Sequence, residues 1–101
     1  MRLDPEVAVG RATLRGITPE NRKAKLDLDD PDEAAIRDAC RHAFDTLGLH
    51  RVQVWLVAGD PAVAAYEAAG FVHEGRARDR LWRDGRFHDC VLLGLLAGEP
   101  R

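Results

Sequence analysis

Residues 49–75, LHRVQVWLVAGDPAVAAYEAAGFVHEG, contain the signals that decide the fold of this chain. The segment Arg51–Ala58 is dense in Val, Leu and Trp, which predicts a largely buried strand. The glycine that follows ends the strand, Asp60 can accept hydrogen bonds from the free N–H groups of a helix start, and Pro61 suits the first helical position. An Ala-rich helix then runs to Gly70, after which a second strand begins. This order predicts a crossover between strands of one sheet.

Two strands and a longer helix are predicted upstream of this unit. Val7–Leu14 has a modest strand signal, and Ala24–Leu28 alternates apolar and charged residues. The polar cluster Gly16–Asn21 predicts the mid-length loop of an antiparallel hairpin between them. From there the apolar period changes to three and four, which predicts a helix over Pro31–Leu47 with Asp30 as its cap.

A long hairpin is predicted downstream. Asp84-Gly85 is the strongest hairpin signal in the chain and lies between the strands His73–Trp82 and Arg86–Leu96. The closing letters CVLLGLL do not alternate, so both faces of that strand are expected to be covered. A two-residue loop would place two pairs of side chains opposite each other, Trp82 with Phe87 and Arg80 with Asp89.

The composition indicates one soluble globular domain over residues 1–101. Its fold class is α/β (α+β): a mixed sheet in the order strand-strand-helix-strand-helix-strand-strand. A net charge of −2 gives no reason to expect nucleic acid or an anionic membrane as a partner. With no apolar run that could cross a bilayer, no signal-peptide pattern, and two lone cysteines without C-x-x-C spacing, we expect a reduced, cytoplasmic protein.

Four segments together resemble one known family. AVAAYEAAGFVHEG resembles the Y-x-x-x-G-F-x-x-E-G segment of the GCN5-related N-acetyltransferases, in the branch that acetylates protein N-termini and small amines. HAFDTLGLHRVQV resembles the end of that family's central helix and its fifth strand, and RARDRLWRDGRFHDCVLLGLL its final hairpin. VGRATLRGITPENRKAKLDLD resembles the third and fourth strands. The resemblance covers about Val7–Leu96 and implies an acetyltransferase-like domain that is truncated at its N-terminus and lacks most of the acceptor-binding wall.

The resemblance also shows where the chain departs from the family at the cofactor site. Members hold the pyrophosphate of acetyl-CoA on a glycine-rich turn before the central helix, where free N–H groups gather round the anion. Residues 28–34 read LDDPDEA here, without glycine or arginine, and Pro31 removes a donor. The family pattern assigns cofactor contacts to Leu28 and to Asp60, where this branch usually has Asn. Acetyl-CoA is therefore possible by resemblance, but no cofactor is the expectation, because four carboxylates would repel it: Asp29, Asp30, Asp32 and Glu33.

Tyr66 is the candidate catalytic residue. By resemblance it stands where many members keep a tyrosine that protonates the leaving thiolate of CoA. The alternative is a core aromatic on a helix face whose hydroxyl reaches the surface. Trp55 is expected in the core.

Other chemistry is less favoured by the sequence. The chain contains no serine, which excludes a Ser-His-Asp hydrolase. Cys40 and His42 face different ways on a helix. The His73-Glu74 and His88-Asp89 pairs lack ligand spacing, so no metal is predicted. A solvated strand face paired with aspartates is expected, rather than an anion or RNA site, for the arginines of the last hairpin: Arg76, Arg78, Arg80, Arg83 and Arg86.

Three functions remain open on these grounds. The first is an acetyltransferase relative that has lost ordinary acetyl-CoA binding and serves as a homodimeric or partner-binding module through the open strand edge at Val7–Leu14. The second is an active N-acetyltransferase that a dimer mate or separate subunit completes, with Tyr66 as general acid. The third is a binding protein for another small ligand in the cleft between the family's fourth and fifth strands.

Overall fold

The computed structural model describes residues 6–18 and 20–99, so the first five residues, Pro19 and the last two of the predicted domain lie outside the described part. The elements confirm the predicted mixed class and its order, with one additional strand at the start. In chain order they are β1 (Val7–Val9), β2 (Ala12–Thr18), β3 (Lys23–Leu28), α1 (Glu33–Arg41), the π-helical turn η1 (His42–Thr46), β4 (Arg51–Val57), α2 (Ala62–Ala68), β5 (Val72–Arg83) and β6 (Arg86–Leu96).

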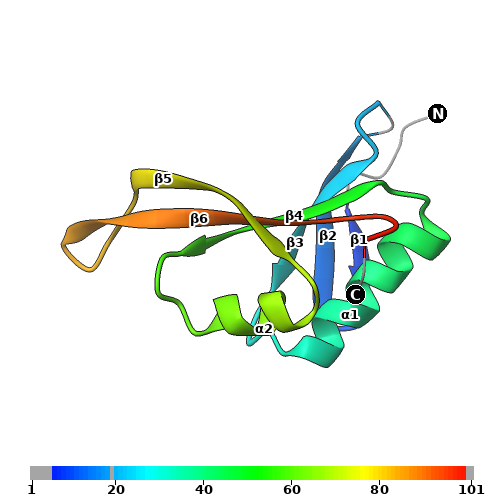
Figure 1. The fold of residues 1–101 in the computed structure, drawn as a ribbon, viewed down its shortest axis with the longest axis horizontal. Helices are drawn as coiled ribbons and strands as arrows, with labels where there is room; N and C mark the ends of the chain where they lie inside the picture. The colour runs from blue at the N-terminus through cyan, green and yellow to red at the C-terminus, as the bar shows by residue number, and fades with distance from the viewer. Residues whose placement is uncertain (1–5, 19, 100–101) are drawn as a thin grey trace.

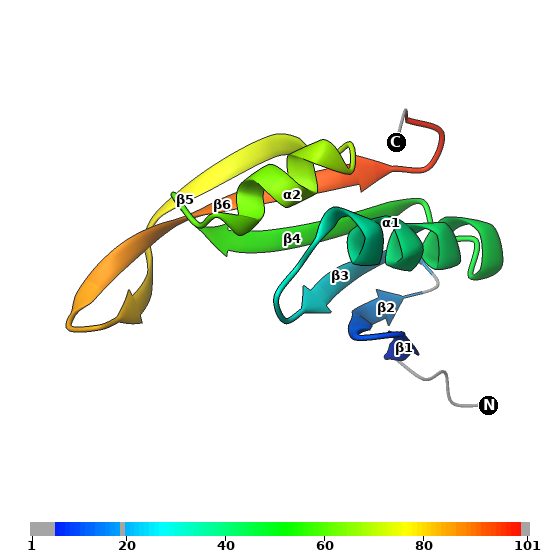
Figure 2. The ribbon, with the colours of Figure 1, turned by 90° about the horizontal axis from the view of Figure 1, so that it is seen from below.

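The strands form one six-stranded sheet in the order β1-β2-β3-β4-β6-β5. Every neighbouring pair is antiparallel except β3 and β4, which run in parallel. Both helices lie against the same face of this sheet (Figures 1 and 2). Since β4 and β5 are each antiparallel to β6, they run in the same direction, as the predicted crossover requires, with β6 between them.

The predicted strand Val7–Leu14 is wrong, because its residues form two strands joined by a tight turn. Gly10 has φ of +61° at this turn, a conformation that costs glycine little, and Val7 pairs back onto Leu14. The strand β2 then continues to Thr18, so the chain turns later than the Gly16–Asn21 cluster predicted. One edge of the sheet is therefore the three-residue β1, and β5 forms the other edge.

The helix predicted over Pro31–Leu47 is shorter and changes type near its end. The α-helical part covers Glu33–Arg41, and one π-helical turn follows, closed by a hydrogen bond of 3.0 Å from the Leu47 N–H to the His42 carbonyl. Of the apolar stripe predicted for this helix, Ile36, Cys40, Ala43 and Phe44 are buried in the core and Leu47 is partly buried. Ala39, which was not part of the predicted stripe, is buried with them.

Trp55 is not part of the buried core, contrary to the prediction. Its side chain is half-buried, and the Arg80 guanidinium lies 4.2 Å from its ring centroid. The prediction failed because the alternation of β4 turns Val52 and Val54 toward the helices and Trp55 to the other face.

The tip of the β5–β6 hairpin follows the sequence prediction. Asp84 and Gly85 both have positive φ, 55° and 77°, which is the two-residue type I′ turn. Trp82 faces Phe87 in the register, and their rings stack edge to face with centroids 4.9 Å apart. Both side chains are exposed, on a hairpin that projects beyond the rest of the domain (Figure 1).

The predicted pair of Arg80 with Asp89 is wrong, because the register shifts between Ala77 and Leu81. Asp89 instead accepts a hydrogen bond from Arg76 at 2.8 Å and one from the main-chain N–H of Asp79 at 3.0 Å. An inserted bulge in β5 thus turns Arg80 away from its expected partner.

A second register shift in β5 occurs at Glu74-Gly75, within the segment that resembles the acetyltransferase family. It falls between His73 and Gly75 and lets the Glu74 carboxylate lie across Gly94 of β6, where a side chain on residue 94 would clash with it. From there Glu74 accepts a hydrogen bond from Arg51 on β4. The hydrogen bond between Arg51 and Glu74 therefore links the first residue of β4 to β5.

Candidate functional site

The start of α1 is where the family's cofactor turn would lie. The cap of this helix is Asp32, whose Oδ1 accepts from the Ala35 N–H at 2.9 Å. Asp30, the predicted cap, is not the cap. Its φ of +46° places it in a left-handed turn two residues earlier, and the helix begins only at Glu33.

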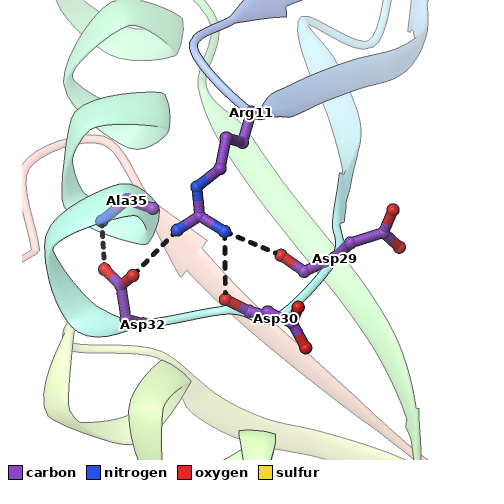
Figure 3. Close-up of polar contacts among 5 residues, drawn as sticks. All are labelled: Arg11, Asp29, Asp30, Asp32 and Ala35. Atoms are coloured by element: carbon purple, nitrogen blue, oxygen red, sulfur yellow. Dashed lines mark hydrogen bonds and ion pairs between the residues drawn. The ribbon is translucent and has the colours of Figure 1, made fainter.

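Arg11 closes this helix start from the neighbouring β1–β2 turn (Figure 3). Its Nη1 donates to the carbonyls of Asp29 and Asp30 at 3.1 and 3.3 Å, and its Nη2 donates to Asp32 Oδ2 at 2.8 Å. The Ala35 N–H first, and Arg11 second, hold the pKa of Asp32 below its ordinary value. One guanidinium thus binds two main-chain oxygens and the capping carboxylate together.

Leu28, the other predicted cofactor contact on this strand, lies at the end of β3. It pairs with Ala12 in the register and packs half-buried against the core. Its structural role is therefore to anchor the strand end from which the Arg11-bound turn departs.

Tyr66 lies in the core with only 1% of its surface exposed, so its side chain does not reach the surface as the core alternative expected. Its ring packs edge to face on Phe71, with centroids 5.2 Å apart. Burial, and to a lesser degree the nearby Cys40, Asp27 and Asp60, raise the pKa of the hydroxyl well above its ordinary value. Tyr66 therefore stays protonated at neutral pH.

Asp60 supports the start of α2. Its Oδ1 accepts from the Ala62 N–H at 2.8 Å, and its carbonyl accepts from the Val63 N–H at 3.0 Å. The hydrogen bond to the Ala62 N–H agrees with the acceptor role predicted for Asp60, but Pro61, predicted as the first helical residue, is the cap and the helix begins at Ala62.

The parallel strands β3 and β4 part beside Tyr66. They pair at only three positions, of which Lys25 with Gln53 is the last, although β3 runs on to Leu28 and β4 to Val57. Asp27 lies in the end of β3 that pairs with β2 but not with β4, and Asp60 follows β4. The negative charges of both help to raise the pKa of Tyr66. The structure thus brings Tyr66 and Asp60 together at this opening, and it leaves Leu28 at the separate Arg11-bound turn.

The other residues considered from the sequence form no further centre. Cys40 and Cys90 are both buried and are not joined in a disulfide. His73 lies 3.3 Å from Glu67, and His88 contacts the Arg83 carbonyl at 3.0 Å. Within residues 6–18 and 20–99, no group of three or more His, Cys, Asp or Glu side chains could hold a metal ion. Neither helix of this part has the length and apolar composition that a bilayer crossing needs.

Sequence reasoning missed Arg11. It lies 21 positions before Asp32, in a turn that was expected to be strand, and a lone arginine after a glycine carries no signal of a long-range partner. The signal that could have found it is the glycine itself, which permits the tight reversal between two short apolar runs.

The six-stranded mixed sheet with its two helices matches the acetyltransferase-like fold that the sequence resemblance implied. No protein-family model matches the chain. A relative from Bacillus subtilis (strain 168), named "Putative ribosomal N-acetyltransferase YdaF", is 34% identical over 99 residues, which is 89% of this chain and 54% of that protein.

Solved structures of one enzyme share the fold. Spermidine N-acetyltransferase from Vibrio cholerae in complex with CoA and spermine has a TM-score of 0.82 and 25% identity, covering 87% of this chain and 57% of that one. Its dodecameric structure in an intermediate state has a TM-score of 0.79 and 26% identity, covering 84% and 55%. The chain belongs to the GCN5-related N-acetyltransferase superfamily, and it spans about half the length of the relatives that it matches.

Proposed function

We propose that this chain is an acetyltransferase-family domain that does not hold acetyl-CoA in the usual way and works as a homodimeric or partner-binding module. The observation that carries the proposal is the closed start of α1. Asp32 accepts from the Ala35 N–H that an incoming phosphate would need, and Arg11 is bound at both of its terminal nitrogens.

The charge at this helix start also opposes an anion. Asp29, Asp30 and Glu33 are sequence neighbours of Asp32, and the guanidiniums at this helix start are already paired, Arg11 with Asp32 and Arg37 with Glu33. A pyrophosphate would have to displace the Asp32 carboxylate and take Arg11 from it. A phosphate binds best at a helix end whose N–H groups are free. The start of α1 is therefore a poor phosphate site, because Asp32 already accepts from one of these groups.

The partner surface that we propose is the β1 edge with the groove beside it. This groove has a volume of about 590 Å³ and lies between the β1–β2 turn and α1, with Val9, Arg11, Asp38, Arg41 and His42 among its lining residues. A strand added to β1 from a second copy would satisfy the edge and lay side chains along the groove. The dodecameric acetyltransferase of Vibrio cholerae shows that a protein of this fold assembles from many copies.

The partner part of the proposal is tested by light scattering over a range of protein concentrations. We expect a dimer that Val7→Lys converts to monomer, because the charge lies on the β1 edge. Val72→Lys, at an exposed apolar position of β5 on the other edge of the sheet, is the control and should remain dimeric. A wild-type protein that stays monomeric at all concentrations would contradict this part.

An active N-acetyltransferase completed by another chain is the second candidate, and the position of Tyr66 favours it. The hydroxyl stays protonated beside the parting strands, as a general acid for a thiolate leaving group must. In that case Tyr66→Phe would slow turnover at least tenfold without unfolding the protein, since only the hydroxyl is removed.

Calorimetric titration with acetyl-CoA separates the two candidates. We expect no heat with the wild-type protein up to millimolar cofactor. Asp32→Asn, which keeps a capping oxygen but frees Arg11 from its carboxylate, should bind weakly, whereas Asp38→Asn, which removes the same charge further along α1, should not. Micromolar binding by the wild-type protein would overturn the first candidate and direct the work to acceptor amines.

A further inference from the structure

A cavity of about 320 Å³ lies at the carboxyl end of β4, away from the closed helix start. It is bordered by the end of β4, the turn before α2 and the bulged part of the β5–β6 hairpin, and it is open to solvent. The residues that line it are Trp55, Leu56, Val57, Asp60, Arg80, Leu81, Arg83 and Cys90. Its size is at the lower end of the range for ligand pockets, which fits a small molecule.

The bulge in β5 supplies this cavity with an arginine that has no carboxylate partner. Asp79 has φ of +48°, and its N–H and the Arg76 guanidinium both bind Asp89, the residue expected to face Arg80. The Arg80 guanidinium is thereby turned onto the Trp55 ring. In the described part of the chain, no carboxylate lies within 4.0 Å of the charged nitrogens of Arg80 or Arg83.

Stacking on an indole prepares a guanidinium to bind an anion. The ring contact takes one flat face, and the N–H donors point outward in the plane, in the fork that matches a carboxylate or phosphate. The ring also fixes the side chain, so less freedom is lost on binding. Bulges are known to re-aim side chains at binding sites, and this one gives Arg80 a direction that a regular ladder would not.

The charged lining determines which anion fits. Arg80 and Arg83 contribute two positive charges, and Asp60 contributes one negative charge. Asp60 uses Oδ1 to accept from the Ala62 N–H, which fixes the orientation of the carboxylate. A ligand with two anionic groups and one ammonium complements this set, whereas a polycation would meet two arginines.

We infer that this cavity binds a small acidic amine of the acidic amino-acid class, with its anionic groups on Arg80 and Arg83 and its ammonium facing Asp60. Trp55 forms the floor under Arg80. The site uses no atom of the α1 start, so it exists whether or not the chain binds acetyl-CoA.

The test uses Trp55 as the reporter and needs no cofactor. The chain has two tryptophans, and Trp82→Phe removes the exposed one while keeping an aromatic pair at the hairpin tip. In this background, L-glutamate should produce a saturable change in Trp55 emission. Glutarate, which lacks the amine, should bind more weakly, and spermidine should produce no saturable change.

Two variants decide whether Arg80 is responsible. Arg80→Gln should weaken glutamate binding about tenfold or more, because a charged hydrogen-bond donor is lost. Arg78→Gln removes the same charge from the same strand outside the cavity and should change the affinity less than twofold. Arg80→Lys, which keeps the charge but not the flat fork, should also weaken binding and covers the case in which Arg80→Gln fails to fold.

Four results would overturn the inference, the last of them by removing the ammonium contact. The first is the absence of a saturable response to glutamate, and the second is an equal loss in the Arg80 and Arg78 variants. The third is tighter binding of spermidine than of glutamate. Equal affinity for glutarate and glutamate would refute the ammonium contact at Asp60. Because acetyl-CoA is absent, these results are independent of the calorimetric test of the helix start.

Discussion

The two helices of this domain begin with the same dipeptide but in opposite surroundings. Asp30-Pro31 precedes α1 and Asp60-Pro61 precedes α2, each after a strand of the parallel pair. At α1, Asp32 accepts from the Ala35 N–H, and Arg11 binds both the Asp32 carboxylate and the carbonyls of the turn. At α2, the aspartate binds one N–H group and otherwise borders a cavity with unpaired arginines.

The comparison shows that a helix start acquires its chemistry from what the rest of the fold brings to it. Both starts have a favourable dipole and an aspartate acceptor. Arg11 comes from the β1–β2 turn, beside the end of β3, and closes the first helix start, whereas the bulge in β5 pairs Asp89 with other groups and leaves Arg80 beside the second. The local sequence is similar, and the long-range contacts decide the difference.

The largest expected effect comes from removing the side chain that holds the open helix in place. Tyr66→Ala should lower the free energy of unfolding by about 3–5 kcal/mol, since it deletes a fully buried aromatic. Tyr66→Phe should cost about 1 kcal/mol at most, because the ring contact with Phe71 remains. Urea unfolding measures both, and a loss below about 1 kcal/mol for the alanine variant would show that α2 does not depend on this contact.

Removing each capping acceptor tests the comparison directly. Asp32→Ala should lower the Tm by a few degrees, because it removes the acceptor for Ala35 and the partner of Arg11 together. Asp60→Ala should lower the Tm by less, since one N–H group loses its acceptor. Differential scanning calorimetry gives both values, and the reverse order would mean that Arg11 does not strengthen the closed start.

Acid should weaken the closed start selectively. The pKa of Asp32 is lowered in the folded protein, so its charge stabilises the fold above about pH 4, and this contribution is lost as the pH falls through the lowered pKa. The difference in Tm between the wild-type protein and Asp32→Asn should therefore shrink toward zero with acidification. A difference that stays constant from pH 6 to pH 3 would contradict a charged role for Asp32.

The smallest expected effect is that of Arg11→Lys. An ammonium keeps the attraction to Asp32 but cannot reproduce the planar fork that also reaches the carbonyls of Asp29 and Asp30. We expect the Tm to fall by about 1–2 °C, because all these groups are exposed. An unchanged Tm for Arg11→Lys, beside a clear loss for Arg11→Ala, would show that charge alone closes the helix start.

Local signals predicted most of the fold because they act over a few residues. Alternation gave β3 and β4, and the Asp84-Gly85 pair gave the hairpin and the facing of Trp82 on Phe87. The first strand was mispredicted because one glycine, without other turn residues, reverses the chain between β1 and β2. Short apolar runs on both sides of it look like one strand.

The site was less predictable, because its decisive contacts join distant positions. The carboxylates before α1 could be counted from the sequence, but not the Arg11 that binds them. The bulge beside Ala77 requires an aspartate in a left-handed conformation, which periodicity does not reveal. The bulge places the Arg80 guanidinium over the ring of Trp55, which had been predicted to be a core residue.

The three-position pairing of β3 with β4 has a consequence for how the molecule holds together. Few main-chain hydrogen bonds join β3 to β4, so the halves β1–β3 and β4–β6 are held together mainly by contacts between apolar side chains. The helix α1 adds to these contacts by packing against both α2 and β2. Hydrophobic attachment weakens on cooling, whereas the hydrogen-bonded β5–β6 ladder depends less on it. At low temperature, amide exchange should therefore rise first along this dividing line, and the cold-labile part of the protein is its middle.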